Sequence, residues 1–199
     1  LHPLDTKEED LPKPAIRPYP SQYQADAKLK DGVTVHMRPI RPEDEPMMAE
    51  FHKTLSDRSV LQRYTQAIAL SDRIAHQRLT RMCFIDYDRE MAIVVTNNKK
   101  PVNEIIAVGR LSRIRGTGDA RFALLVSDAW QQRGLGKVLL GQLLDIARRE
   151  NDITKVVGEM LKDNIGMQHI CRNTGFTLTE DTATGMLHAE INVPGGKAS

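Results

Sequence analysis

Residues 122–137, FALLVSDAWQQRGLGK, join a short apolar run to a glycine-rich loop and to the start of an amphipathic segment. The run from Phe122 to Val126 is too short for a helix and is followed by polar turn residues, which favours a strand. Beyond the loop, apolar residues recur with the 3.6-residue period of one helix face: Leu139, Leu140, Leu143, Leu144 and Ala147. This part of the chain is therefore predicted to be strand, glycine loop and helix, with the helix ending near Asn151.

The glycines at 134 and 136 indicate an anion site at the start of this helix. Because they lack Cβ atoms, a ligand can approach the backbone, where free N–H groups and the positive end of the helix dipole face the same place. A Walker loop would need Gly at Gln131, and the dinucleotide fingerprint would need Gly at Leu139. The loop predicts a phosphate or pyrophosphate site, but no magnesium-bound nucleoside triphosphate.

The overall composition favours one soluble domain with a tail. The chain has 199 residues, and its 28 basic and 26 acidic residues leave a net charge of +2. No long block of one sign appears, so neither nucleic acid nor an acidic membrane surface is indicated as a partner. Cys83 and Cys171 have no second ligand at metal-binding spacing, which predicts no metal site and fits a reducing cytoplasm. No apolar stretch approaches the length of a membrane span.

Residues 1 to about 30 have the composition of a linker, because they hold five of the ten prolines and few aliphatic residues. We expect this segment to be a proline-rich linker or tail, and residues 31–199 to be the folded domain. The first residue is Leu and not Met, which is expected of a fragment cut from a longer protein and equally of a tag scar. Helices are expected at 42–55, 56–64, from 72 through 82, and at 164–174. Strands are expected at 33–37, 91–96, 105–114, 155–161, 176–179 and 186–192, in addition to the central one.

This order predicts an α/β (α+β) fold, with a mixed central sheet of about seven strands and helices on both faces. The strand that ends at Val126 and the strand that starts at Lys155 are expected to be parallel neighbours, joined by a right-handed crossover.

From about Val33 to Asn192 the chain resembles the GNAT superfamily of N-acetyltransferases. The loop Gln131-x-x-Gly134-x-Gly136 is similar to the family's pyrophosphate loop, and Asn164-x-x-Met167-x-x-x-Cys171-x-x-x-Gly175-Phe176 is similar to a second family motif. The resemblance implies acetyl-CoA as acyl donor. The residues that it assigns to coenzyme A are Leu124, Leu125, Val126, Gln131, Gln132, Arg133, Gly134, Leu135, Gly136, Lys137 and Asn164.

Three segments resemble the Pat-type protein lysine acetyltransferases of bacteria: AIRPYP at 15–20, RPIRPED at 38–44 and GEML at 158–161. In those proteins a proline-rich linker joins the GNAT domain to a region similar to NDP-forming acyl-CoA synthetases. The resemblance implies a protein lysine acceptor, with an acyl-CoA synthetase as one candidate, and a possible fusion to such a region.

The proton-transfer residues depart from the family pattern. The subgroup would place a Glu base at Arg121 and the superfamily a Tyr acid at Cys171. A lysine amine must be neutral to attack a thioester, which costs about 4 to 5 kcal/mol at pH 7, so another base is useful. Glu159 and Asp119 are the candidate bases, and Cys171 is the candidate acid. Glu159 could instead face solvent or pair with Arg121, Asp119 could be a turn residue, and Cys171 a buried apolar side chain.

The sequence therefore predicts an acetyl-CoA-dependent N-acetyltransferase that acetylates a protein lysine by direct transfer in a ternary complex. Two alternatives remain: a GNAT enzyme that acetylates a small amine, and a non-catalytic sensor of acyl-CoA, because both usual proton carriers are replaced.

Overall fold

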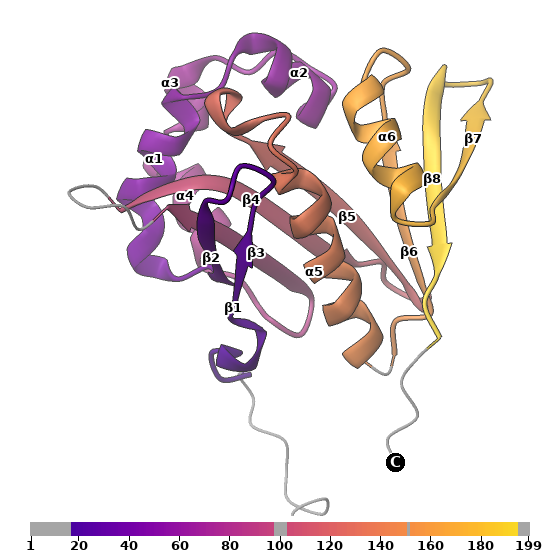
Figure 1. Ribbon diagram of the computed structural model, residues 1–199, viewed down its shortest axis with the longest axis horizontal. Coiled ribbons are helices and arrows are strands. Elements are labelled where there is room, and N and C mark those ends of the chain that lie inside the picture. Colours follow the sequence, from indigo (N-terminus) through magenta and orange to yellow (C-terminus); the bar gives the residue numbers. More distant parts are fainter. Residues whose placement is uncertain (1–16, 98–102, 151, 195–199) are drawn as a thin grey trace, which may run out of the picture.

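The structure is a computed structural model that describes residues 17–97, 103–150 and 152–194. One mixed sheet of eight strands runs through it in the order β1-β2-β3-β4-β5-β6-β8-β7 (Figure 1). The strands are β1 (Ala25–Lys28), β2 (Thr34–Pro39), β3 (Glu90–Asn97), β4 (Glu104–Arg113), β5 (Asp119–Val126), β6 (Lys155–Met160), β7 (Thr177–Asp181) and β8 (Met186–Asn192). All neighbours are antiparallel except β5 and β6, which confirms the predicted parallel pair.

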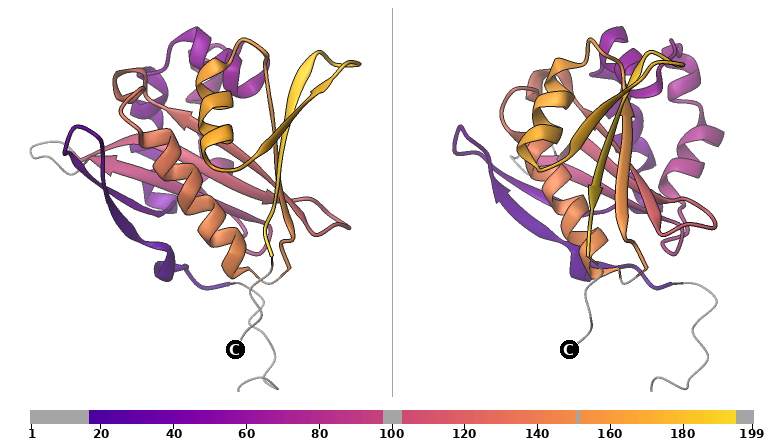
Figure 2. Two further views of the ribbon diagram at one scale, coloured as in Figure 1. Left: turned by 45° about the vertical axis from the view of Figure 1, so that its right-hand side comes forward. Right: turned by 90° about the vertical axis from the view of Figure 1, so that its right-hand side faces the viewer.

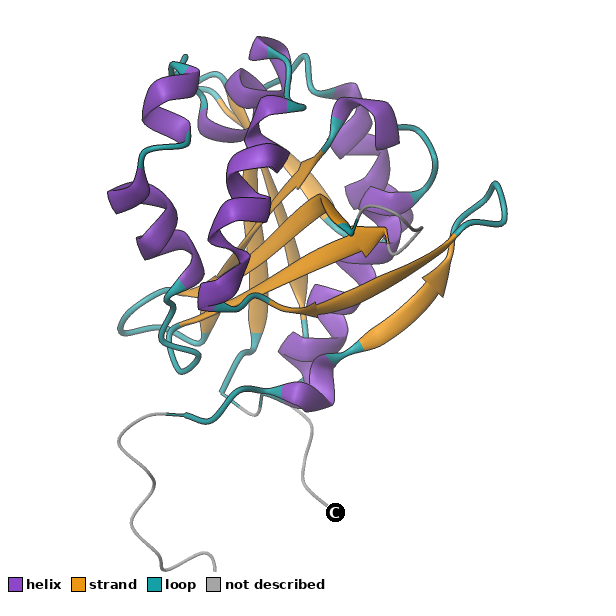
Figure 3. Ribbon diagram, turned by 90° about the vertical axis from the view of Figure 1, so that its left-hand side faces the viewer, coloured by secondary structure: helices purple, strands orange, loops and turns teal. Residues whose placement is uncertain are grey.

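Among the described residues, six α-helices cover the two faces of the sheet: α1 (Glu45–Lys53), α2 (Asp57–Tyr64), α3 (Leu70–Arg73), α4 (His76–Cys83), α5 (Leu135–Arg149) and α6 (Ile165–Asn173). The first four lie on one face, and α5 and α6 lie on the other (Figure 2). Figure 3 shows the same layers with helices and strands in different colours. Helices on both faces of a mixed sheet are what the sequence predicted, with one strand more than the expected seven.

Alternating side chains of β5 supply both cores. Phe122 and Leu124 join the buried cluster that contains the apolar face of α5, whereas Leu125 joins the cluster beneath α1, α2 and α4. The predicted apolar positions of α5 are confirmed, because Leu139, Leu140, Leu143, Leu144 and Ala147 are all buried. The strand and the helix that follow each other in the sequence therefore pack together and fix the loop between them.

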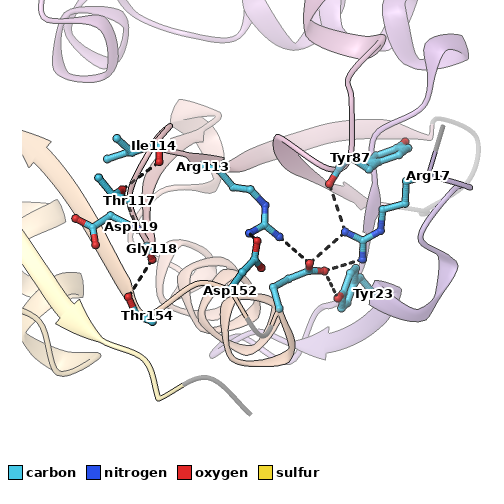
Figure 4. Close-up of polar contacts among 11 residues, drawn as sticks. Arg17, Tyr23, Tyr87, Arg113, Ile114, Thr117, Gly118, Asp119, Asp152 and Thr154 are labelled. Carbon is cyan, nitrogen blue, oxygen red and sulfur yellow. Dashed lines mark hydrogen bonds and ion pairs between the residues drawn. The ribbon is translucent and has the colours of Figure 1, made fainter. Parts of the chain in front are cut away.

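The expected linker boundary near residue 30 is wrong. Tyr23 is only 4% exposed, and β1 pairs with β2 from Ala25 opposite Met37 onward. Arg17 and Tyr23 both bond to Glu150 at the end of α5, the arginine with Nη2 at 2.7 Å from the carboxylate and the phenol also at 2.7 Å (Figure 4). The folded part begins by residue 17 at the latest, and residues 1–16 lie outside the described range.

Two further expectations need correction or fall outside the described residues. The helix expected from 72 through 82 is two helices, because Ala75 takes an extended conformation (φ −57°, ψ 129°) between α3 and α4. The hairpin of β3 and β4 is confirmed by their antiparallel pairing, but most of its expected turn lies outside the described residues.

Candidate active site

A cleft opens where β5 and β6 separate. Their parallel pairing covers only Asp119 to Arg121 opposite Lys155 to Val157, although β5 continues to Val126 and β6 to Met160. The cleft has a volume of about 1130 Å³ and is lined by the ends of both strands, the glycine loop, α2 and α6. The strand ends and the loop that the sequence singled out are therefore brought together.

Backbone hydrogen bonds show which N–H groups of β5 point into this cleft. Ser127 N–H donates to Ile106 at 2.9 Å, and Asp119 C=O accepts from Ile114 at 2.9 Å, so the odd-numbered residues of β5 bond to β4. Because N–H directions alternate along a strand, those of Leu124 and Val126 point toward the open edge. Of Leu125 and Val126, which the resemblance assigns to coenzyme A, Val126 has the N–H group directed at the cleft and Leu125 does not.

The strands separate beside a contact between Phe122 and Gly158. A Cβ atom on Gly158 would lie 2.3 Å from Cε1 of Phe122, so the aromatic ring occupies the space of the missing side chain. The same ring packs on Phe176, with 5.2 Å between ring centroids. The glycine of β6 is therefore required by packing at the head of the cleft.

The glycine loop presents an open helix terminus to the cleft. Gly134 is the N-cap of α5 in the left-handed conformation (φ 88°), and no side chain caps the helix. The first N–H groups of an α-helix have no partner within it, and the helix dipole adds partial positive charge. Gly136 has a second role, since a Cβ there would lie 2.7 Å from Cδ1 of Ile170 in α6.

The side chain of Gln131 is turned toward the protein, where it holds the loop to α2. Its amide donates to Ser59 Oγ at 3.0 Å and to the Val126 carbonyl at 3.2 Å. Asp128 accepts from Ser59 Oγ at 2.8 Å. Burial alone would raise the pKa of Asp128, but hydrogen bonds from Ser56 and Ser59 hold it below its usual range. This network fixes α2 against the glycine loop.

Three basic side chains take different positions around the loop. Arg133 stacks over the Trp130 ring at 4.1 Å and pairs with Asp31, so it braces the loop from outside. Lys30 lines the cleft, and its side chain lies against the Cα of Gly134. Lys137 lines the same cleft, so two lysines accompany the helix terminus.

Asn164 is the N-cap of α6 and also lines the cleft. Its side-chain oxygen accepts from Met167 N–H at 3.1 Å. That bond uses the oxygen and leaves the amide hydrogens for other acceptors.

Glu159 and Arg121 lie together on the α2 side of the cleft. Their side chains are 52% and 57% exposed, and Glu159 Oε1 lies 4.0 Å from Arg121 Nη2. Glu159 is not buried with its apolar neighbour Met160, because a strand sends Glu159 and Met160 to opposite faces. Glu159 is therefore half exposed and also within ion-pair distance of Arg121, and its role as a base stays a prediction.

Cys171 and Asp119 lie away from the cleft. Cys171 is fully buried in the core beneath α5 and α6, and burial raises the pKa of its thiol to about 12. Asp119 stands at the opposite end of β5 from Val126, about 23 Å away at the usual rise of a strand, in the turn that Figure 4 shows. The structure therefore does not bring either of them to the reacting groups.

The described residues contain no group of three or more His, Cys, Asp or Glu side chains that could hold a metal ion. Over the same ranges, no helix is long and apolar enough to cross a membrane.

The family model of the acetyltransferase (GNAT) domain matches residues 34–177, well over half of the chain. The chain belongs to the GNAT acetyltransferase family. It is 26% identical over 162 residues to acetyltransferase PA5475 of Pseudomonas aeruginosa, a match that covers 80% of this chain and 85% of that protein. The GNAT domain of S. lividans PAT superposes with a TM-score of 0.78 at 28% identity over 87% of this chain and 99% of that one. RimJ of Mycobacterium smegmatis, solved with a CoA-disulfide, gives 0.66 at 14% identity over 85% and 86%.

This GNAT domain is an acetyl-CoA-dependent acyltransferase, and its cleft fits the donor. The uncapped start of α5, with Lys30 and Lys137 beside it, suits phosphate oxygens. The open edge of β5 at Leu124 and Val126 suits the amide groups in the extended arm of coenzyme A. An unpaired strand edge binds a peptide in the same way.

Sequence reasoning missed several residues of this GNAT cleft. Lys30 lies in the predicted linker, Ser59 lies within the helix predicted at 56–64, and Asp128 is one of the polar turn residues after the predicted central strand. The Ser59 contact spans 72 residues to Gln131, so no local pattern could have shown it. Arg63 of α2 also lines the cleft, and its place on a predicted helix gave no sign of that.

Proposed function

We propose that this GNAT domain acetylates a lysine side chain of another protein, by direct transfer within a ternary complex. The observation that carries the proposal is that the cleft opens onto an exposed part of the sheet, not into a closed pocket. Arg121, Glu159, His188 and Glu190 project from one side of β5, β6 and β8, because their positions are cross-strand neighbours. We call these four residues the acceptor face, and all four side chains are at least 35% exposed.

The charges of the cleft argue against a small polyamine as acceptor. Its basic lining residues are Lys30, Arg58, Arg63, Arg121 and Lys137, and its acidic ones are Asp128, Glu159 and Asp163. Asp128 is engaged with α2, and Glu159 is near Arg121. A polycation would therefore meet excess positive charge, whereas a protein can offer one lysine together with complementary groups.

Direct transfer agrees with the position of the two cysteines. Cys83 and Cys171 are buried, and burial raises the pKa of their thiols to about 11 and about 12. Neither can act as a thiolate nucleophile at the cleft. Acetyl-CoA supplies an activated acetyl thioester, so no acetyl-enzyme is needed.

The chain's own groups then have two tasks. The N–H groups of Leu124 and Val126 offer donors to an oxyanion that develops at the open edge of β5. Glu159 can accept the proton that the lysine amine loses, since it is the carboxylate of the acceptor face that lines the cleft. An acyl-CoA synthetase is the first acceptor to test, because of the resemblance to Pat-type enzymes.

The test is incubation with labelled acetyl-CoA, candidate proteins and a panel of small amines. We expect label on protein lysines and intersecting initial-rate plots when both substrates are varied. Label on small amines alone would support the small-molecule alternative. Tight acetyl-CoA binding without transfer to either class would support the sensor alternative, and parallel plots would contradict direct transfer.

A further inference from the structure

The cleft contains an arginine whose charge has no carboxylate partner within the described part of the chain. Arg63 of α2 is half-buried and lines the cleft beside Tyr64, with its guanidinium carbon 4.8 Å from the centre of that ring. Arg78 of α4 lies over the same ring at 5.2 Å, and its Nε is buried without a partner. Among the described residues, neither arginine has a carboxylate within ion-pair distance.

Other charges nearby do not balance this pair. Glu90 is already bound to Arg110, whose Nη1 lies 2.8 Å from its carboxylate. Arg73 is buried and donates to the backbone carbonyl of His52. Burial lowers the pKa of Arg63, which reflects the cost of holding its charge away from water. A guanidinium in this state gains most from a bidentate carboxylate.

The position of Arg63 separates it from the donor end of the cleft. Ser59, four residues earlier in α2, is the residue tied to Gln131 and hence to the glycine loop. Arg63 therefore lies about 6 Å further along the helix. Arg110 of β4, which acts on the charge of Arg63, is the cross-strand neighbour of Ala123 and so lies on the α2 side of the sheet, as Arg121 does.

We propose that Arg63 forms a carboxylate-binding subsite that selects acceptor lysines with Asp or Glu close by. This inference rests on the proposed protein lysine acceptor and adds its recognition chemistry. The Tyr64 ring contacts the guanidinium, 4.8 Å from its carbon, and the acceptor's carboxylate binds the guanidinium N–H groups. The incoming acid also offsets the positive charge that Arg63 and Arg78 bring to the place where a cationic lysine must enter.

The experiment uses the full chain, saturating acetyl-CoA and three synthetic peptides that differ only in the residues flanking one lysine: Glu, Gln or Arg. For the unaltered protein we expect kcat/KM to be about tenfold higher with the Glu peptide than with the Gln peptide. Arg63→Gln should bring this ratio close to one. Arg63→Glu should reverse it in favour of the Arg peptide, a change that a purely structural role would not produce.

Arg81→Gln is the matched control, because Arg81 is an exposed arginine on the neighbouring α4, bonded to the Gln77 carbonyl. It should keep the preference for Glu. Melting temperature and acetyl-CoA affinity should be unchanged in all three variants. Weaker acetyl-CoA binding in Arg63→Gln would assign the subsite to a donor phosphate and overturn the proposal.

The remaining outcomes are also decisive. Equal rates with all peptides, or a Glu preference that survives both Arg63 variants, would overturn the subsite while leaving lysine acetylation intact. Absence of acetylation with every peptide and protein, despite binding of acetyl-CoA, would contradict the proposed function itself.

Discussion

Gly158 faces the ring of Phe122 so closely that any side chain would collide with it. We expect Gly158→Ala to lower the free energy of unfolding by about 1 to 3 kcal/mol, as overpacking does in close-packed cores. Chemical denaturation would measure this loss. Phe122→Leu in the same chain should recover part of it, and strictly additive effects of the two substitutions would contradict the contact.

His52 is fully buried, and neither ring nitrogen has a hydrogen-bond partner. Burial, together with the charges of Arg73, Arg78 and Arg110, lowers its pKa from 6.5 to about 4. Between pH 4 and pH 6.5 the imidazole of His52 therefore binds a proton in the unfolded chain but stays neutral in the folded chain. Stability should be fully present above pH 6.5 and should fall by about 3 kcal/mol toward pH 4.

Urea denaturation at several pH values would show this effect as a difference between the unaltered protein and His52→Leu. The variant should lose the part of the pH dependence that lies between 4 and 6.5. His76→Gln is the control, since His76 is exposed on α4. Identical pH profiles for the protein and the His52 variant would refute the assignment.

Glu159 is expected to act as the base in spite of its exposure, because it lines the cleft on the acceptor face. Glu159→Gln should lower turnover by about 10² at pH 7 and leave acetyl-CoA affinity unchanged. Glu190→Gln, an exposed carboxylate of the same face on β8, should change turnover little. If both variants turn over like the unaltered protein, proton removal needs no carboxylate of this face.

At the scale of elements, the contact of Gly136 with Ile170 joins α5 to α6. A bulky residue at 136 is therefore expected to disturb helix packing as well as ligand access. Gly136→Ala should weaken both the fold and acetyl-CoA binding. Gly136→Ala with Ile170→Ala removes the collision and separates the two causes, with Ile170→Ala alone as the control.

Calorimetry of acetyl-CoA binding would then distinguish disturbed helix packing from blocked ligand access. We expect the double variant to regain thermal stability but to bind acetyl-CoA more weakly than Ile170→Ala, because a Cβ still narrows the approach to the helix terminus. Equal affinity in these two variants would show that Gly136 serves helix packing alone.

The strongly periodic elements could be predicted from the sequence, and the elements defined by one or two residues could not. The apolar face of α5 repeats over several turns, so its register is visible locally. The break between α3 and α4 rests on the backbone of Ala75, which leaves the apolar period almost intact. β1 is a short edge strand of small and charged residues, and prolines precede it. The proline-rich composition therefore predicted a linker, although small and charged residues alternate along β1.

The residues of the candidate active site also divide into those that a local motif predicts and those that depend on distant contacts. The loop glycines and Asn164 belong to local motifs and all line the cleft, and their contact with coenzyme A stays a prediction. Gln131 was expected to contact the ligand, but its partner Ser59 is 72 residues away. The direction of a side chain in tertiary contact depends on such distant partners, and one sequence does not reveal them.

For the whole molecule, the segment from Arg17 to Lys28 is expected to matter for stability. Glu150 binds Arg17, Tyr23 and Arg113 together, with Arg113 Nη2 at 2.8 Å (Figure 4). A chain that begins at Leu29 should melt at a clearly lower temperature than the full chain, because it loses β1, the buried Tyr23 and two partners of a half-buried carboxylate. Glu150→Gln in the full chain should cause a smaller loss, and equal melting of all three proteins would contradict this role.

The short pairing between β5 and β6 divides the sheet into two groups of strands, which we expect to open at different rates. β1 to β5 share long ladders, and β6, β8 and β7 form the other group. Amide hydrogen exchange should reveal a partial opening in which β7 and β8 exchange well before β3 and β4. A ligand that contacts both groups of strands links them. Acetyl-CoA should therefore slow amide exchange in β7 and β8, although these strands do not form its loop. It should also couple the unfolding of the two groups.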